Sequence, residues 1–278
     1  MELKLISDNK TFNGSQRVYS HYSETCKCDM TFGLFLPEKA SFKKVPVLWF
    51  LSGLTCTHEN AMTKAGVQQF ASEKGLALVF PDTSPRGEEV PNSPDFDLGH
   101  GAGFYLDANQ SPWSEHFNMD TYIKEELNTL IFRNFEVDQS MQGITGHSMG
   151  GLGALNLALK NQDQFRSVSA FSPISNPTES EWGQKQFSAY LGEDPVLWKD
   201  YDPSILLKKH GFPTKLLIDQ GKDDNFYDLL RPGSLSDQFS ANKALGEFRY
   251  HNGYDHSYFF ISTFIKDHLE HHVKILLD

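Results

Sequence analysis

The sequence lacks the features of membrane proteins and of disulfide-rich secreted proteins. It has no run of about eighteen or more apolar residues, so no segment is predicted to span a bilayer. Residues 1–8 contain no long apolar segment followed by a small-residue cleavage site, so no secretory signal is expected. Three cysteines, Cys26, Cys28 and Cys56, are too few for a disulfide framework and fit a reducing compartment. We therefore expect a cytoplasmic protein.

Positive charge is also scarce. The chain has 25 lysines and arginines against 36 acidic residues, a net charge of −11, which argues against a nucleic-acid or anionic-membrane partner. An anionic small molecule would need a local basic pocket. Repeats and low-complexity tracts are absent, and 39% hydrophobic residues in 278 are enough for one large core. The sequence predicts a single domain over residues 1–278.

Strand-like and helical segments alternate along most of the chain. The expected strands cover residues 30–36, 45–51, 76–80, 142–145, 167–171, 215–219 and 247–251. The expected helices cover residues 60–74, 122–132, 149–160, 234–245 and 257–276. This alternation predicts an α/β fold with a mostly parallel sheet covered by helices on both faces. Sites in such sheets form at the carboxyl ends of the strands.

The sequence Gly-His-Ser-Met-Gly at residues 146–150 has the form of a nucleophile elbow. It lies between a strand-like stretch and a helix of small and apolar residues, as a sharp strand-to-helix turn requires. The glycines on either side of Ser148 would let the neighbouring backbones approach closely. The alternative is a glycine-rich turn that only packs a helix against a sheet. We interpret Ser148 as the nucleophile of a serine hydrolase.

A serine nucleophile needs a base, which is usually a histidine oriented by a carboxylate. In the order Ser, acid, His, only His256 lies in a loop, between an expected strand and the last helix. His251 belongs to a strand, and His147 has no room to reach a carboxylate. His268 and His272 have metal-ligand spacing on the last helix. No glutamate accompanies them as in zinc proteases, so a solvated helix face is expected there and no metal.

Three carboxylates are candidates for the acid, and two amides are candidates for the oxyanion hole. Asp219, Asp223 and Asp224 all lie near the end of one strand, and residue chemistry alone does not choose among them. The amide after the nucleophile, of Met149, and the amide of Leu54 in the loop after an earlier strand would stabilise the transition-state oxyanion.

Six segments resemble the S-formylglutathione hydrolase family, also called esterase D, along nearly the whole chain. They are LSGLTCT at 51–57, PDTSPRG at 81–87, GAGFY at 101–105, GHSMGG at 146–151, IDQGKDD at 218–224 and GYDHS at 253–257. The resemblance implies an α/β-hydrolase fold, a triad of Ser148, Asp224 and His256, and an oxyanion hole from Leu54 and Met149. It thereby selects Asp224 as the acid. It also implies that no cofactor is needed and suggests a homodimer.

The implied reaction is hydrolysis of S-formylglutathione to glutathione and formate, a step of formaldehyde removal. A generalist short-chain carboxylesterase is the main alternative; an acyltransferase and a catalytically dead binding module are others. Glutathione carries two carboxylates and one ammonium group, so positive charge is expected at the pocket rim. Arg86, Lys185 and Lys222 are hypothetical contributors, and Trp182 and Phe187 are hypothetical walls of the acyl pocket.

Cys56 lies two residues from the proposed Leu54 donor. Its position suggests that thiol-modifying reagents would impair turnover. The alternative is a small residue that only fills space.

Overall fold

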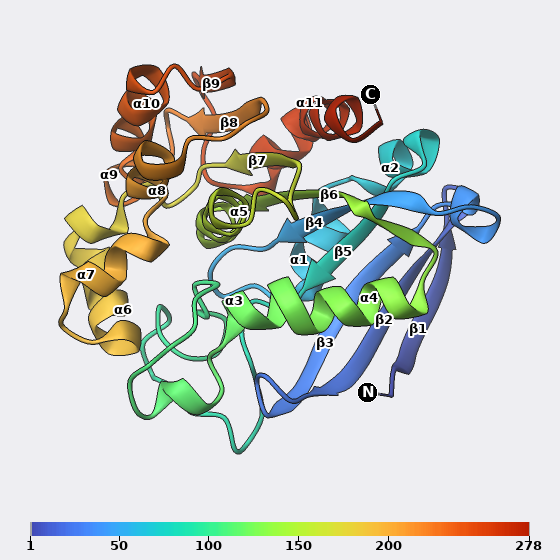
Figure 1. Ribbon diagram of the computed structural model, residues 1–278, viewed down its shortest axis with the longest axis horizontal. Helices are drawn as coiled ribbons and strands as arrows, with labels where there is room; N and C mark the ends of the chain where they lie inside the picture. The colour runs from blue at the N-terminus through green and yellow to red at the C-terminus, as the bar shows by residue number, and fades with distance from the viewer. Residues whose placement is uncertain (1, 278) are drawn as a thin grey trace.

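A nine-stranded sheet forms the centre of the molecule in the computed structural model, which describes residues 2–277. The strands are β1 (Lys4–Thr11), β2 (Gly14–Ser23), β3 (Cys28–Leu36), β4 (Val45–Leu51), β5 (Ala77–Pro81), β6 (Val137–His147), β7 (Ser167–Phe171), β8 (Leu216–Gly221) and β9 (Gly246–His251). Their order across the sheet is β1-β2-β3-β5-β4-β6-β7-β8-β9. Figure 1 shows the first strands at one edge and β9 at the other.

The sheet is antiparallel at its N-terminal edge and parallel elsewhere. Strands β1, β2, β3 and β5 pair antiparallel, whereas β5, β4, β6, β7, β8 and β9 pair parallel in that order. The prediction of a mostly parallel sheet is confirmed. Strands β4 and β7 have the expected bounds, and β1 and β2 were not expected.

Helices cover both faces of the sheet, as predicted. They are α1 (His58–Lys64), α2 (Gln68–Lys74), α3 (Met119–Thr121), α4 (Asn128–Asn134), α5 (Met149–Lys160), α6 (Glu181–Leu191), α7 (Pro195–Trp198), α8 (Pro203–His210), α9 (Tyr227–Leu230), α10 (Pro232–Ala241) and α11 (Tyr258–Leu277). A π-helical segment, Tyr122–Leu127, joins α3 to α4. Short 3₁₀ helices cover Glu38–Ser41, Trp113–Glu115, Pro177–Glu179 and Lys199–Tyr201.

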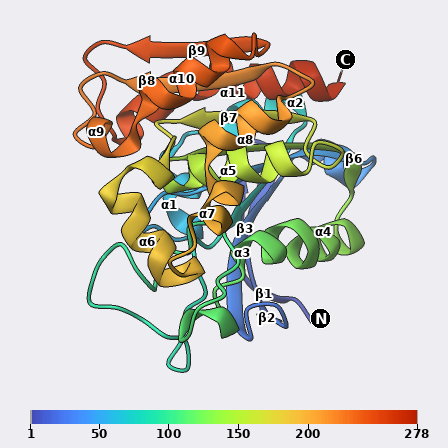
Figure 2. The same ribbon diagram turned by 60° about the vertical axis from the view of Figure 1, so that its left-hand side comes forward.

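The sheet separates two apolar cores. Side chains of α4, α5, α8 and α10 pack on one face, and those of α1, α2 and α11 pack on the other. Figures 1 and 2 show α4 and α5 on the side of the sheet opposite α11. Strands β4, β5 and β7 contribute side chains to both cores, which is why they are buried along their whole length.

Some expected helices differ from the observed ones. The helix expected at 60–74 is two helices, because the chain breaks at Gly66, whose φ is 72°. Helix α5 has the expected bounds and is buried over nearly its whole length. Helices α6 to α9 were not expected, and α6 contains Trp182 and Phe187, the two hypothetical walls of the acyl pocket. Among the helices of residues 2–277, none has both the length and the apolar character needed to cross a membrane.

Candidate active site

Ser148 occupies the sharp turn between β6 and α5. Its φ of 58° and ψ of −119° are values that L-residues rarely adopt. The turn is fixed by the Ser148 amide, which donates to the Phe171 carbonyl at 3.0 Å, and by the Ser148 carbonyl, which accepts from Leu152 at 3.0 Å. A Cβ atom at Gly150 would collide with the Leu51 carbonyl, so the close approach of α5 to β4 requires glycine there.

His256 lies in the loop between β9 and α11, as the sequence predicts. Its Nδ1 is 2.7 Å from Oδ2 of Asp224, which follows the end of β8. The Asp224 Oδ1 accepts from the Phe226 amide at 2.8 Å. Burial acts to raise the pKa of Asp224, but the hydrogen bond and charge of His256 and the Phe226 amide outweigh it and lower that pKa. Asp224 is therefore an ionised carboxylate that orients the imidazole.

The other two acid candidates lie elsewhere. Asp219 is fully buried and binds Arg249 through both of its oxygens, at 2.6 Å each. Asp223 is exposed at the surface. Of the three carboxylates near the end of β8, Asp224 is the one that contacts His256.

The loop after β4 carries the Leu54 amide. Within residues 2–277 this amide donates to no acceptor, whereas its neighbour Thr55 donates to the Gly101 carbonyl at 2.9 Å. The Met149 amide begins α5, where first-turn amides have no acceptor within the helix. Leu54 and Ser148 line the same cavity, so the loop that carries the free Leu54 amide forms part of the cavity wall.

A cavity of about 350 Å³ opens over the serine. It is bounded by Gly53, Leu54, Thr55, Cys56, Phe96, His147, Ser148, Trp182, Phe226, Leu230, His256 and Tyr258. Ser148 and His256 thus face one space, which is mostly apolar. Such a cavity can hold a small acyl compound beside a serine and a histidine.

Comparisons with known proteins show the family to which the chain belongs. The putative esterase family matches residues 23–271. An S-formylglutathione hydrolase of Paracoccus denitrificans is 54% identical over 271 residues, which cover 98% of this chain and 97% of that protein. The chain belongs to the S-formylglutathione hydrolase family of esterases.

Solved structures agree on the fold. The structure of an S-formylglutathione hydrolase from Agrobacterium tumefaciens has a TM-score of 0.95 and 48% identity, with 98% of this chain and 99% of the other covered. A fluorophosphonate-binding serine hydrolase of Staphylococcus aureus, at 23% identity and covering 94% and 98%, has a TM-score of 0.75 and shares the fold. The resemblance to the family and the α/β-hydrolase fold that it implies are therefore confirmed.

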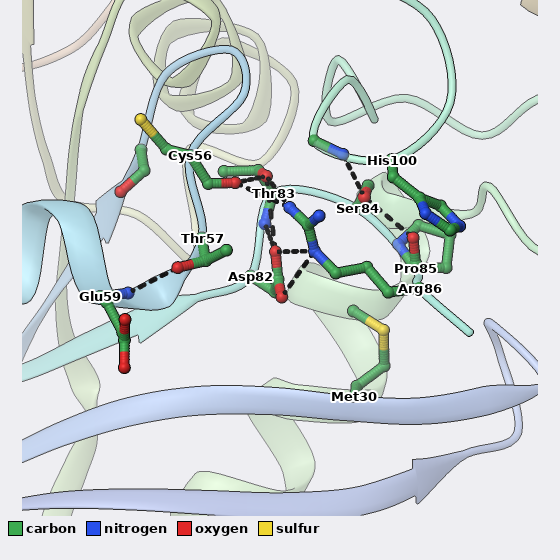
Figure 3. Close-up of polar contacts among 12 residues, drawn as sticks. Met30, Cys56, Thr57, Glu59, Asp82, Thr83, Ser84, Pro85, Arg86 and His100 are labelled. Atoms are coloured by element: carbon green, nitrogen blue, oxygen red, sulfur yellow. Dashed lines mark hydrogen bonds and ion pairs between the residues drawn. The ribbon is translucent and has the colours of Figure 1, made fainter. Parts of the chain in front are cut away.

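Arg86 of this esterase does not reach the cavity. Its Nε donates to both oxygens of Asp82 at 3.1 Å, and its Nη2 donates to the Cys56 carbonyl at 2.9 Å. Figure 3 shows Arg86 turned toward Asp82 and Thr83, and the Thr83 hydroxyl also donates to the Cys56 carbonyl. The hypothesis that Arg86 binds substrate is therefore not supported, because its donors hold the loop that carries Leu54.

The two lysines that were expected to bind substrate also lie outside the cavity wall of the esterase. Lys185 forms ion pairs with Asp97 at 2.8 Å and with Asp95 at 3.0 Å. Lys222 is exposed, and its backbone amide bonds the His251 carbonyl. The cavity wall contains neither lysine.

Of the two expected wall aromatics, only Trp182 lines the cavity. Its indole donates to Asp97 Oδ2 at 2.9 Å, which fixes the ring. Phe187 is fully buried five residues further along α6, with Trp198 at a ring distance of 6.3 Å, so its expected place in the wall is wrong. The other wall aromatics, Phe96, Phe226 and Tyr258, were missed. Phe226 follows the acid candidate Asp224 by two residues, and this position could have indicated that it lines the cavity.

His147 was excluded as the base, and the structure gives it a different place. The centre of its ring is 4.4 Å from the centre of the His256 ring. The His256 ring also meets the Phe226 ring in an edge-to-face arrangement, with 5.0 Å between the ring centres. Both nitrogens of His147 are buried without a hydrogen-bond partner within residues 2–277. Burial, together with the nearby His256, holds the pKa of His147 well below its usual value, so the ring is neutral.

The histidines of α11 do not form a solvated helix face. His268 and His272 are fully buried, which contradicts that expectation. His272 contacts the hydroxyls of Ser167 and Ser169 at 2.7 and 2.8 Å, and His268 lies against Phe171 at a ring distance of 3.7 Å. Residues 2–277 contain no group of three or more side chains placed to bind a metal ion.

Proposed function

We propose that this esterase hydrolyses S-formylglutathione to glutathione and formate, with Ser148 as nucleophile, His256 as base and Asp224 as the orienting acid. The 2.7 Å contact between Asp224 and His256, in a cavity that His256 shares with the strained Ser148, is the observation that carries this proposal. The names of the relatives from Paracoccus and Agrobacterium support the choice of substrate. The product formate would make the reaction a step of formaldehyde detoxification.

The first half-reaction forms a formyl-enzyme. Nε2 of His256 removes the Ser148 hydroxyl proton as the oxygen attacks the formyl carbon, and the carbonyl electron pair moves to oxygen. The Leu54 and Met149 amides then donate to this oxyanion. When the intermediate collapses, the C–S bond breaks and glutathione thiolate leaves, taking the proton from His256. Asp224 stabilises the imidazolium formed in between.

The second half-reaction releases formate. His256 removes a proton from water, whose oxygen attacks the formyl ester, and the same two amides stabilise the second oxyanion. Collapse breaks the C–O bond to Ser148, which regains its proton from His256. Neither half-reaction requires electron transfer or a cofactor.

Labelling with a fluorophosphonate followed by mass spectrometry tests the nucleophile. The adduct is expected on Ser148, and Ser148→Ala should lower kcat for S-formylglutathione by at least about 10³-fold. Ser140→Ala, at an exposed position earlier in β6, serves as the matched control and should leave both labelling and turnover intact. A label on another serine, or full turnover by Ser148→Ala, would disprove the proposal.

A generalist carboxylesterase is the second candidate, and the cavity wall supports it. Phe96, Trp182, Phe226 and Leu230 present more apolar surface than a formyl group can fill. Comparing kcat/KM for S-formylglutathione with that for a short nitrophenyl ester separates the two functions. A higher value for the nitrophenyl ester would favour the generalist.

A further inference from the structure

The cavity wall offers no positive charge to a substrate that carries two carboxylates. None of its twelve lining residues is a lysine or an arginine. The whole chain has a net charge of −11, so its long-range field also repels an anionic thioester. A nearby cation that is not already neutralised would therefore have a large effect on binding of the glutathione portion.

Lys64, the last residue of α1, lies beside the cavity. Its Nζ is 5.9 Å from the centre of the Tyr258 ring, and Tyr258 belongs to the cavity wall. A second wall residue is also near it: burial raises the pKa of the Cys56 thiol, and the charge of Lys64 is the main influence that opposes this rise. Tyr258 and Cys56 come from different parts of the chain, so they locate the Lys64 amine independently.

Lys64 also differs from Arg86, the other cation near Cys56, in having no carboxylate partner within residues 2–277. The charges of Lys64 and Arg86 both act on Cys56, but Arg86 is bound to Asp82. In Figure 3 the Cys56 sulfur points away from the Arg86 ion pair. Lys64 is exposed, and within residues 2–277 it forms no ion pair with a carboxylate. Its amine can therefore bind an incoming anion without first breaking an internal bond.

We propose that Lys64, with the face of Tyr258 beneath it, forms an anion subsite that binds a carboxylate of the glutathione leaving group. This inference rests on the proposed function. Tyr258 lines the same cavity as His256, and the His147 ring lies 5.8 Å from the Tyr258 ring and 4.4 Å from the His256 ring, so the subsite adjoins the base that would deliver a proton to the departing sulfur. The subsite favours anionic thiols over neutral ones, and Trp182 and Phe96 remain available to the rest of the substrate.

The test compares two formyl thioesters, S-formylglutathione and the S-formyl derivative of neutral 2-mercaptoethanol. The measured quantity is the ratio of their kcat/KM values. Lys64→Gln should lower this ratio about tenfold, the value of one charge-assisted contact, while Lys64→Arg should retain it. The loss should shrink at high ionic strength because salt screens an exposed pair. S-formylglutathione with its glycyl carboxylate esterified identifies the carboxylate: if that group is the one bound, Lys64→Gln no longer affects the ratio for this substrate.

Lys266→Gln is the matched control. Lys266 is another exposed lysine over an aromatic ring, at 5.7 Å from Phe70, but Phe70 is not part of the cavity wall. Its replacement should change the ratio by less than about twofold. An unchanged ratio in Lys64→Gln, or an equal change in Lys266→Gln, would overturn the subsite. If the wild type itself shows no preference for S-formylglutathione over the neutral thioester, the proposed substrate is wrong, whatever Lys64 does.

Discussion

Ser148 combines a strained backbone with close neighbours that maintain the strain. The positive φ of a non-glycine residue costs about 1–3 kcal/mol, so the surroundings must hold it. They do so through the hydrogen bonds of the Ser148 amide and carbonyl and through the contact of Gly150 with β4. The motif was visible in the sequence because it needs particular small residues at fixed positions.

The acid was not visible in the same way. Asp219, Asp223 and Asp224 have the same chemistry and nearly the same place in the chain, and only their orientation separates them. Arg249, which follows Asp219 by 30 residues, donates to both oxygens of the Asp219 carboxylate. No local sequence pattern predicts this ion pair. Resemblance to a family therefore selected Asp224, where reasoning from the residues left three candidates.

Asp224→Asn and Asp223→Asn form a matched pair of neighbouring substitutions. Asp224→Asn should lower kcat by about 10³- to 10⁴-fold, because an amide no longer fixes the His256 tautomer or stabilises the imidazolium. Asp223→Asn, at an exposed position, should change kcat by less than about twofold. Steady-state kinetics with S-formylglutathione measure both. A large loss in Asp223→Asn alone would move the acid to that residue.

Cys56 should be the thiol whose alkylation stops turnover. It lines the cavity, whereas Cys26 and Cys28 are buried. Burial raises the pKa of the Cys56 thiol, so the reaction should be slow at neutral pH and accelerate as the pH rises and thiolate forms. We expect activity to fall more than about tenfold once mass spectrometry finds Cys56 fully alkylated, because the adduct displaces substrate. Cys56→Ala should resist the reagent, and full activity of the alkylated wild type would contradict the idea.

At the scale of elements, the loop after β4 depends on contacts far away in the sequence. Arg86, which is bound to Asp82, donates to the Cys56 carbonyl, and the Gly101 carbonyl accepts from the Thr55 amide. Burial raises the pKa of Asp82, and the Arg86 charge opposes this. Two loops thereby fix the Leu54 amide, which is the condition for a preorganised oxyanion donor.

Arg86→Lys keeps the charge but removes the forked contact to Asp82 and Cys56. We expect kcat to fall on the order of tenfold for S-formylglutathione and for a nitrophenyl ester alike, with KM nearly constant, because the loosened Leu54 amide acts in the transition state. Lys185→Met removes a comparable ion pair outside the cavity and should change kcat less than about twofold. A rise in KM for S-formylglutathione alone would instead make Arg86 a substrate-binding residue.

Some elements could be predicted from the sequence and others could not, for physical reasons. Strands β4 and β7 are buried on both faces and read as apolar runs with clear ends. Strand β1 is an exposed edge with little apolar alternation, so its pattern resembles a loop. Helix α6 buries Gly183 and Gln186 beside Phe187 and Tyr190, and a hydropathy pattern does not count the first two as apolar.

At the scale of the whole molecule, α11 joins the loop that carries His256 to the core through buried polar groups. Asp219 on β8 contacts Arg249 on β9 at 2.6 Å and His268 on α11 at 3.2 Å, and Arg249 also binds Asp267 of α11 at 2.9 Å. The network ties together the elements on either side of the loops that carry Asp224 and His256. The residues of this network come from three elements. The periodicity of α11 alone therefore predicted a solvent-exposed face for its histidines.

Acid should unfold the molecule partly through two histidines of α11, the half-buried His271 and the fully buried His272. Burial lowers the pKa of His271 to about 4, with the nearby His268 acting in the same direction, and burial also lowers the pKa of His272. The unfolded chain binds protons below a pKa of about 6.5 that the folded chain excludes. The stability contribution is therefore complete above about pH 6.5 and declines as the pH falls toward the folded value.

We expect His271 alone to remove about 2 kcal/mol of unfolding free energy between about pH 7 and about pH 5, at about 1.4 kcal/mol per pH unit below 6.5. Urea unfolding at both pH values measures this loss, and His271→Gln should show correspondingly less of it. His210→Gln, on the surface at the end of α8, should lose as much as the wild type. Burial acts to raise the pKa of Asp219, but its hydrogen bonds and charged neighbours outweigh burial and lower that pKa. Asp219 therefore stays ionised over this pH range. Burial raises the pKa of Asp82, so carboxylates of this kind also titrate differently in the folded and unfolded chains. Comparing the wild type with His271→Gln separates the contribution of His271 from theirs. Equal losses in the wild type and His271→Gln would show that the folded state does not hold this histidine in the neutral form.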